Sequence, residues 1–199
     1  MMFDGRVAAL AAGGYLIGAI PFGAIISKVF YKKDIRLCGS GNTGATNVWR
    51  VLGPMPGVTT LILDVLKGVI PALIAKRLFP TQPLVQVLCG LTPIVGHNWS
   101  LFLRGKGGKG VATSAGVFLS LLPIESAFAI AAFIIVFLLT KHVSLGSMAG
   151  ALALTIASFW FGTYGVFRAL VLLAAIMILI KHIPNMRRLA KGTEPKVKF

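Results

Sequence analysis

Seven apolar runs, separated by short polar segments, constrain the fold of this sequence more than any other feature. They cover residues 6–29, 52–75, 83–101, 111–123, 124–140, 146–162 and 165–181. A helix that crosses the hydrocarbon core of a bilayer needs roughly 17–25 mostly apolar residues. Only 13% of the residues are charged, too few to solvate a globular surface. The sequence therefore predicts an all-α, polytopic integral membrane protein.

The fourth run, 111–123, is short for a complete crossing, and the basic residues decide whether it crosses. If all seven runs cross, 15 Lys and Arg lie on one side and 4 on the other, with Lys67 inside a span. If the fourth run is re-entrant, the same count becomes 9 against 10. Because cytoplasmic loops carry the excess of Lys and Arg, we expect seven transmembrane helices, with the N-terminus outside and the C-terminus cytoplasmic.

The larger group of basic residues then lies on the cytoplasmic side and the smaller group outside. The cytoplasmic group is Lys28, Lys32, Lys33, Arg36, Arg50, Arg104, Lys106, Lys109, Lys141, Lys181, Arg187, Arg188, Lys191, Lys196 and Lys198, and the outer group is Arg6, Lys76, Arg77 and Arg168. The net charge of +15 suits loops that face an anionic leaflet and anionic substrates. In this context it does not indicate nucleic acid.

No internal repeat or second domain is visible, so residues 1–199 are expected to form one domain, with 189–199 as a loose tail. Asp4 precedes the first apolar run, Arg6 begins it, and no small-residue cleavage site follows it, so this run is predicted to be a retained first span. Cys38 and Cys89 lie far apart, with no Cys/His spacing of the zinc type. Neither a disulfide nor a metal is expected.

The longest polar interruption is Gly39-Ser-Gly-Asn-Thr-Gly-Ala-Thr-Asn-Val-Trp-Arg50. Its glycines let the backbone approach a ligand closely, and Arg50 presents a fork of donors that matches phosphate. Hydrogen-bonding side chains come from Ser40, Asn42, Thr43, Thr46 and Asn47. A flexible turn-forming loop is the alternative. The Gly-x-Gly-x-x-Gly match at 39–44 is not a dinucleotide fingerprint, because no βαβ unit surrounds it.

Two further segments again combine glycine or amide groups with cations, and the charge distribution places all three on the cytoplasmic side. Arg104-Gly-Lys-Gly-Gly-Lys-Gly110 lacks the Walker pattern, but its amides and lysines, with a helix beginning at about Gly110, suit an anion. A basic loop that touches lipid headgroups is the alternative. The other segment runs from His182 to Glu194. Together the three segments predict one anion site.

Other polar residues lie near these segments. Asp64 and Lys67 are an i,i+3 pair inside the second run, where either a structural ion pair or a substrate role is consistent with the pattern. Supporting positions are also expected for His97, at the end of the third run, and Lys141, at the corner before Ser144 and Ser147. His182, Asn185 and Arg188 share a face if the last helix continues, although Pro184 disturbs that pattern.

These segments resemble the motifs of the acyl-phosphate:glycerol-3-phosphate acyltransferases, the PlsY family of bacterial membrane enzymes. The resemblance covers essentially the whole chain. Its motifs are Gly39 to Arg50, the glycine–lysine loop from Gly105 to Gly110, the run Leu63–Gly68, and the pattern His182, Asn185, Arg188, Gly192, Glu194. It implies a seven-helix enzyme of the bacterial inner membrane. The reaction transfers a fatty acyl group from acyl phosphate to the 1-hydroxyl of glycerol 3-phosphate, giving lysophosphatidic acid and phosphate.

The resemblance also implies roles for residues. Acyl phosphate is expected at Gly105, Gly107, Gly108, Lys109 and Gly110. Catalytic positions are expected at Lys109, Ser147, His182 and Asn185. Glycerol 3-phosphate is expected at Ser40, Asn42, Thr46, Asn47, Arg50, Lys109, Ser147, His182, Asn185 and Arg188, and supporting positions are Asp64, Lys67, His97, Lys141 and Glu194.

Acyl phosphate is an activated mixed anhydride, so neither a metal nor an organic cofactor is expected, and no obligate protein partner is indicated. No His in this chain is followed five residues later by Asp, as other glycerolipid acyltransferases require. The base is therefore either His182 or an oxygen of a substrate phosphate. A small permease for phosphate esters and a structural protein that binds anionic lipid remain the alternatives from other classes.

Overall fold

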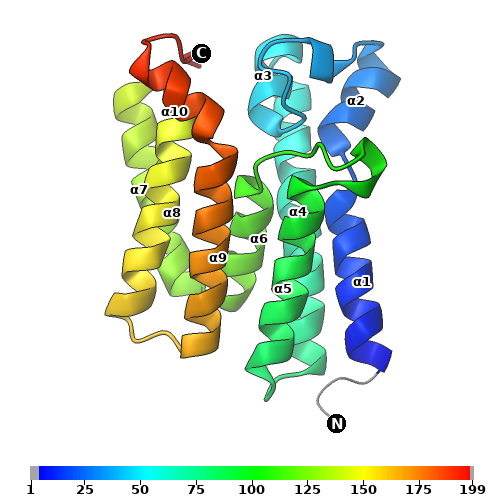
Figure 1. The fold of residues 1–199 in the computed structure, drawn as a ribbon, viewed down its shortest axis with the longest axis vertical. Helices are drawn as coiled ribbons and strands as arrows, with labels where there is room; N and C mark the ends of the chain where they lie inside the picture. Colours follow the sequence, from blue (N-terminus) through cyan, green and yellow to red (C-terminus); the bar gives the residue numbers. More distant parts are fainter. Residues whose placement is uncertain (1–4, 198–199) are drawn as a thin grey trace. The chain divides into compact units, whose positions relative to one another are not determined.

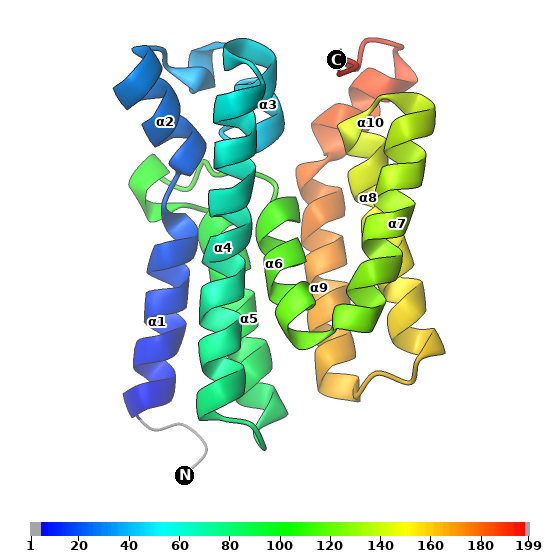
Figure 2. The same ribbon diagram turned by 180° about the vertical axis from the view of Figure 1, so that it is seen from behind.

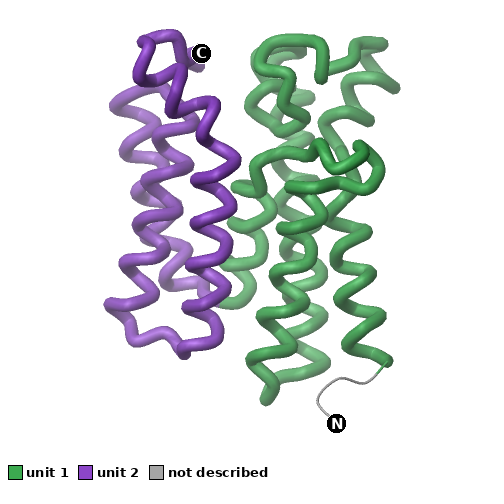
Figure 3. Tube along the Cα trace, viewed as in Figure 1, with its two compact units in different colours: residues 1–121 green, residues 122–199 purple. Residues whose placement is uncertain are grey.

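The computed structural model describes residues 5–197, so Asp4 and Lys198, which entered the sequence predictions, lie outside the described residues. Those residues form ten α-helices and two short 3-10 helices and contain no strand, which confirms the all-α prediction. The chain divides into two compact units, the first ending at Leu121 and the second beginning at Leu122 (Figure 3). The sequence shows no boundary there.

Unit 1 contains six α-helices and both 3-10 helices (Figure 1). They are α1 (Gly5–Ala19), α2 (Phe22–Tyr31), η1 (Ile35–Leu37), α3 (Ala45–Leu52), α4 (Pro54–Leu78), α5 (Pro83–Asn98), η2 (Leu101–Leu103) and α6 (Val111–Leu121).

The first predicted span is two helices and not one, because α1 and α2 meet at an angle of 42° at Ile20 and Pro21. Proline has no backbone N–H and its ring crowds the preceding turn, so a helix seldom continues through it. The break leaves the carbonyl of Ile20 to accept a hydrogen bond from Lys67 Nζ at 3.0 Å. Pro21 was therefore the sequence signal for the break.

Small residues let the helices of unit 1 approach closely, as expected where lipid gives no hydrophobic drive for helix association. A Cβ at Gly18 would overlap the backbone of Pro93 in α5. A Cβ at Gly68 would likewise overlap the carbonyl oxygen of Thr113, and one at Gly116 that of Val65. These contacts join α1 to α5 and α4 to α6, and Figure 2 shows α4 beside α5 and α6.

Unit 2 contains α7 (Pro123–Thr140), α8 (Val143–Trp160), α9 (Gly165–Lys181) and α10 (Ile183–Ala190). The middle helix α8 packs against α7 and α9, and a Cβ at Gly146 would lie only 2.9 Å from the carbonyl oxygen of Phe133. The α7–α8 corner, α10 and residues 191–197 lie at the same end of this unit (Figure 1).

Three described helices, α4, α7 and α8, are long and apolar enough to cross a membrane. The total rises to five if each of the bent pairs α1–α2 and α9–α10 is one span. The apolar helix α6 has only 11 residues. Seven crossings and the orientation of the termini therefore stay predictions.

The expectation of a loose tail from residue 189 is wrong for the described part of that segment. Leu189 and Ala190 complete α10. Beyond it, Thr193 N donates to Arg188 O at 2.8 Å, and Val197 N donates to Lys141 O at 3.0 Å. Glu194 is only 7% exposed. Hydrogen bonds to α10 and to the α7–α8 corner thus hold the segment in place.

Candidate active site

The first polar segment is half turn and half helix. Asp34 begins η1 by accepting from the backbone and the side chain of Arg36, and this ion pair lowers the pKa of Asp34 to about 2. The chain then turns through Gly39 and Gly41, both with positive φ, and enters α3 at Ala45. A wholly flexible loop is excluded.

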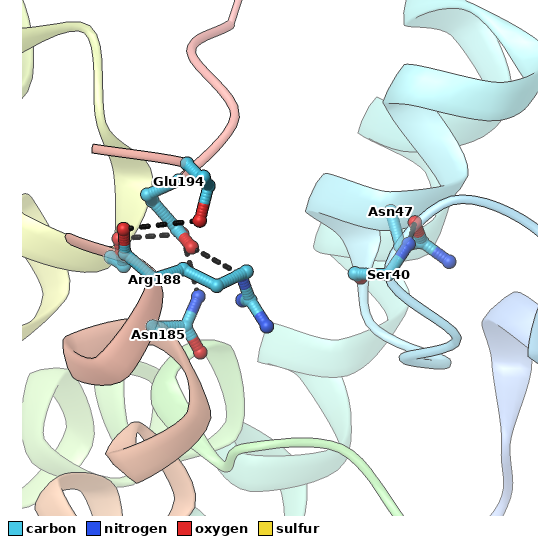
Figure 4. Close-up of polar contacts among 7 residues, drawn as sticks. Ser40, Asn47, Asn185, Arg188 and Glu194 are labelled. Atoms are coloured by element: carbon cyan, nitrogen blue, oxygen red, sulfur yellow. Dashed lines mark hydrogen bonds and ion pairs between the residues drawn. The ribbon is translucent and has the colours of Figure 1, made fainter. Parts of the chain in front are cut away.

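Asn47, in the first turn of α3, holds this turn together (Figure 4). Its Oδ1 accepts from Ser40 N at 2.8 Å, and its Nδ2 donates to Cys38 O at 3.0 Å and to Asn42 O at 2.9 Å. The residue is 2% exposed. Asn47 therefore shapes the loop, a role that the sequence prediction missed, and its direct contact with a glycerol hydroxyl stays a prediction.

The remaining groups of this segment are arranged around that turn. Asn42 Oδ1 accepts from Gly44 N at 2.8 Å and thereby sets the entry into α3. Ser40 is exposed, whereas Thr46 and Arg50 are half-buried and lie one helical turn apart. Residues four apart lie on one face of a helix, so a hydroxyl and a guanidinium share a face of α3.

The glycine–lysine loop connects η2 to α6, which begins at Val111, as predicted from the helix start near Gly110. Its glycines let it lie against the end of α5. A Cβ at Gly107 would overlap the carbonyl oxygen of His97, and one at Gly108 would overlap the His97 ring. Gly110 has a φ of +78°, and a Cβ there would lie 2.7 Å from Asn98 Oδ1. Close packing therefore accounts for much of the glycine content.

Two backbone amides of this loop already pair within the protein. Gly108 N donates to His97 O at 3.0 Å, and Gly105 N donates to Ser100 O at 2.9 Å. The prediction that the Gly108 amide binds the donor phosphate is therefore corrected, because this amide pairs within the protein. Lys109, the next residue, is half-buried and stays the predicted cation of the loop.

Beneath the loop, Asp64 and Lys67 form the predicted i,i+3 ion pair, with Nζ and Oδ1 2.8 Å apart. Both side chains are buried, and His97 Nδ1 lies 3.7 Å from the same carboxylate oxygen. A small cavity at this place is lined by these three residues together with Thr43, Gly107 and Gly108. The first polar segment and the glycine–lysine loop therefore meet one cavity within unit 1.

In unit 2, Glu194 organises the third segment (Figure 4). Its Oε1 accepts from Ser144 Oγ at 2.8 Å and from Asn185 Nδ2 at 2.6 Å. Its Oε2 accepts from Arg188 Nε at 2.7 Å. Within residues 5–197 the two terminal nitrogens of Arg188 have no hydrogen-bond partner, so they remain able to bind an anion.

The protonation of Glu194 follows from these contacts. Burial by itself raises the pKa of the carboxyl, but the hydrogen bonds from Asn185, Ser144 and Arg188 and the charge of Arg188 outweigh it. The pKa of Glu194 is therefore lowered from its ordinary value of 4.5, and the group is ionised at neutral pH. The Glu194 carboxylate fixes both Asn185 and Arg188 in place. It therefore has a larger part in the site than the supporting role that the sequence predicts.

His182 and Ser147 are both buried in unit 2. His182 lies between α9 and α10, which meet at 51°, and Pro184 falls in the first turn of α10. His182 Nδ1 lies 2.8 Å from the carbonyl oxygen of Ile178. A carbonyl only accepts, so Nδ1 carries the proton and Nε2 is the basic nitrogen. Ser147 Oγ donates to Val143 O at 2.8 Å.

Lys141 ends α7 in a left-handed conformation, with a φ of 60°, and its carbonyl accepts from Val197 N. It thus anchors the C-terminal segment through its backbone. Within unit 2 the structure brings Asn185, Arg188 and Glu194 into contact, as the predicted motif requires. That the groups of the two units serve one site stays a prediction.

Sequence reasoning missed some polar groups. Ser144, which has no place among the expected site residues, is a direct partner of Glu194. Thr113 and Ser114, in the first turn of α6, are buried hydroxyl residues whose oxygens have no hydrogen-bond partner among the described residues. Their position directly after a glycine–lysine loop, at a helix start, was the available signal.

Comparison with known proteins gives a consistent result. Residues 8–192 match the family described as glycerol-3-phosphate acyltransferase. Glycerol-3-phosphate acyltransferase 2 of Bacillus anthracis is 47% identical over 92% of this chain and 95% of its own length. The glycerol-3-phosphate acyltransferase of Fusobacterium nucleatum subsp. nucleatum is 46% identical over 93% and 95%.

Solved structures agree with the sequence relatives. The crystal structure of PlsY, an integral membrane glycerol 3-phosphate acyltransferase, in its glycerol 3-phosphate form matches with a TM-score of 0.94 and 36% identity. The match covers 98% of this chain and 96% of that one. Its lysophosphatidic acid form matches with a TM-score of 0.90. The chain therefore belongs to the glycerol-3-phosphate acyltransferase family of integral membrane enzymes.

Proposed function

We propose that this protein transfers a fatty acyl group from acyl phosphate to the 1-hydroxyl of glycerol 3-phosphate. The products are lysophosphatidic acid and inorganic phosphate, and the reaction is the first step of phospholipid synthesis. The observation that carries the proposal is the near-complete match to PlsY in a glycerol 3-phosphate form, for a chain that presents several anion-binding groups. The protein is placed in the bacterial inner membrane, with its active site on the cytoplasmic side.

Glycerol 3-phosphate is assigned to the first and third polar segments. The guanidinium of Arg50 and the terminal nitrogens of Arg188 bind its phosphate, since the planar fork of arginine matches phosphate oxygens bidentately. Ser40, Asn42 and Thr46 supply hydrogen-bonding groups from unit 1, and Ser147, His182 and Asn185 supply them from unit 2. Glu194 acts indirectly, because it holds Asn185 and Arg188 in place. Asn47 holds the turn at Ser40 and is also proposed to contact a glycerol hydroxyl.

Acyl phosphate is assigned to the glycine–lysine loop. The ammonium of Lys109 neutralises the donor phosphate, and the backbone at Gly105, Gly107 and Gly110 lets that phosphate approach closely. The acyl chain lies between helices or extends into the bilayer. A donor with a phosphate head suits this protein better than acyl-CoA, because the polar segments between its helices are short and offer little surface for a nucleotide.

The reaction is an acyl transfer to an alcohol. The 1-oxygen of glycerol 3-phosphate attacks the acyl carbonyl carbon, the bond from that carbon to the phosphate oxygen breaks, and phosphate leaves with the electron pair. The hydroxyl proton passes to an oxygen of a substrate phosphate or to His182 Nε2. Since the leaving group is already activated, positioning and charge stabilisation supply the catalysis, and no cofactor enters.

A product assay tests the proposal against the permease alternative. Purified protein is given glycerol 3-phosphate and palmitoyl phosphate, and the lipids are analysed by mass spectrometry. We expect lysophosphatidic acid that depends on protein, donor and acceptor. Uptake of unmodified glycerol 3-phosphate into proteoliposomes, without lysophosphatidic acid, would instead support the permease.

A further inference from the structure

Two buried residues of α4, Asp64 and Lys67, form an ion pair that the proposed reaction does not use. Their side chains are 3% and 2% exposed, and the charged atoms lie 2.8 Å apart. Replacing a buried ion pair by apolar groups of similar volume is often neutral for stability, although removing one partner alone is strongly destabilising. A gain in folding stability is therefore a weak explanation for why Asp64 and Lys67 are buried as an ion pair. The contacts that the two side chains make with other elements point to another role.

The pair reaches two other elements of unit 1. Lys67 Nζ donates to Ile20 O at 3.0 Å, at the break between α1 and α2, and lies 5.7 Å from the centre of the Phe22 ring. Asp64 Oδ1 lies 3.7 Å from His97 Nδ1, at the end of α5. This distance is longer than a hydrogen bond, but the negative charge of Asp64 favours the imidazole orientation and tautomer that place a proton on Nδ1.

His97 contacts the glycine–lysine loop in two ways. Its carbonyl oxygen accepts from Gly108 N at 3.0 Å. Its ring lies so close to Gly108 that a Cβ there would overlap Nε2. Gly108 directly precedes Lys109, so the orientation of the His97 ring limits where the backbone carrying Lys109 can lie.

The space below the loop is polar and small. The cavity there has a volume of about 10 Å³, roughly enough for one water molecule. Asp64, Lys67 and His97 line it together with Thr43, Gly107 and Gly108. The loop therefore rests partly on charged and polar groups, and a change in those groups alters what supports it.

We propose that Asp64, Lys67 and His97 form a positioning network that holds the glycine–lysine loop in the geometry that binds the acyl donor. The network touches no reacting atom in this account. It acts because an error of about 1 Å in the placement of a catalytic group costs on the order of 100-fold in rate. The kinetic part of this inference rests on the proposed function, whereas the structural part does not.

Two variants and one control test the network. Asp64→Asn combined with Lys67→Met removes both charges together, so no uncompensated buried charge remains. His97→Phe keeps a ring against Gly108 but removes Nδ1. Lys76→Met is the control, because Lys76 lies in the same helix and its Nζ also donates to a backbone carbonyl, that of Ser120 at 2.9 Å.

Hydrogen exchange measured by mass spectrometry reports on the loop without any substrate. We expect residues 104–110 to exchange about tenfold faster in the double variant and in His97→Phe, with α6 and the thermal unfolding midpoint little changed. In kinetics, kcat/KM for palmitoyl phosphate falls about tenfold or more, while KM for glycerol 3-phosphate stays within about twofold. Lys76→Met behaves as the wild-type protein.

Wild-type exchange at residues 104–110 in both variants would overturn the network, and so would faster exchange spread evenly over unit 1. If the double variant does not fold, His97→Phe alone decides. Wild-type protein that is inactive with palmitoyl phosphate would reject the proposed function, but the exchange measurement would still test the network.

Discussion

Asn47 shows how one buried side chain determines the shape of a substrate segment. Its amide bonds to Ile35 O, where the bond is buried, and to Ser40 N, Cys38 O and Asn42 O, where the bonds are partly buried, so replacing it leaves these backbone groups without partners. A buried group left without a partner costs about 1–3 kcal/mol, and a partly buried group costs less because water can reach it. We expect Asn47→Ala to lower the thermal unfolding midpoint and to reduce activity more than tenfold, measured as lysophosphatidic acid formed per minute.

Ser40→Ala is the matched control for Asn47, since it removes a hydroxyl but keeps the Ser40 N–H that bonds to Asn47. It should leave the unfolding midpoint unchanged. An Asn47→Ala protein with wild-type stability would show that the amide does not hold the turn.

Replacing Arg50 by lysine separates the effect of the planar guanidinium geometry on phosphate binding from the effect of the positive charge. Lysine keeps the positive charge but is a point donor that cannot bind two phosphate oxygens through a planar fork. We expect Arg50→Lys to lose most of its activity, with a raised KM for glycerol 3-phosphate and an unchanged fold. Near-normal kcat/KM for glycerol 3-phosphate in this variant would remove Arg50 from the site.

The chemical types of the site residues were predictable from sequence, but some of their roles were not. Cations and amides beside glycines indicate phosphate binding wherever they occur. Whether an amide faces the ligand or its own backbone depends on packing, as Asn47 and Gly108 show. A pattern of residue types does not contain that information.

The Glu194 carboxylate links α8, α10 and the C-terminal segment, so its charge state affects a whole element. Because its pKa is lowered in the folded protein, its stabilisation is complete above the ordinary value of 4.5 and is lost as the pH falls through the lowered pKa. We expect Glu194→Gln to lower the unfolding midpoint at pH 7 in detergent, and the difference from wild type to shrink as the pH falls below 4.5.

The same variant should release the C-terminal segment, and trypsin cleavage at Lys191 and Lys196 reports this independently. If the unfolding midpoints of the wild-type protein and of Glu194→Gln differ by the same amount from pH 7 to pH 3, the ionised carboxylate is not the stabilising species.

The positions of the long helices were predictable from sequence, whereas the points at which helices break or short helices begin were less predictable. Apolar runs located α4, α7, α8 and α9 closely, because lipid contact demands continuous apolar sequence. The break at Pro21 and the short helix α3 were missed. Pro21 was the signal for the first break, and the turn before α3 depends on the hydrogen bonds of Asn47, which a pattern of residue types does not reveal.

For the whole molecule, the charge bias of 15 basic residues to 4 makes a prediction about orientation. The positive-inside rule places the C-terminus in the cytoplasm and the N-terminus outside. Alkaline phosphatase, active only outside the cytoplasm, and green fluorescent protein, fluorescent mainly inside it, are fused to each terminus in turn. Alkaline phosphatase activity at the C-terminus would contradict seven crossings.

The identity of the acyl donor decides whether the proposed reaction is right, and one assay with two donors measures it. Purified protein in detergent, with a chelator present, is given glycerol 3-phosphate and either palmitoyl phosphate or palmitoyl-CoA, and both lysophosphatidic acid and free phosphate are measured. We expect equal amounts of the two products from palmitoyl phosphate, with little or no lysophosphatidic acid from palmitoyl-CoA. Efficient use of palmitoyl-CoA, or activity that disappears in chelator and returns with a divalent metal, would contradict it.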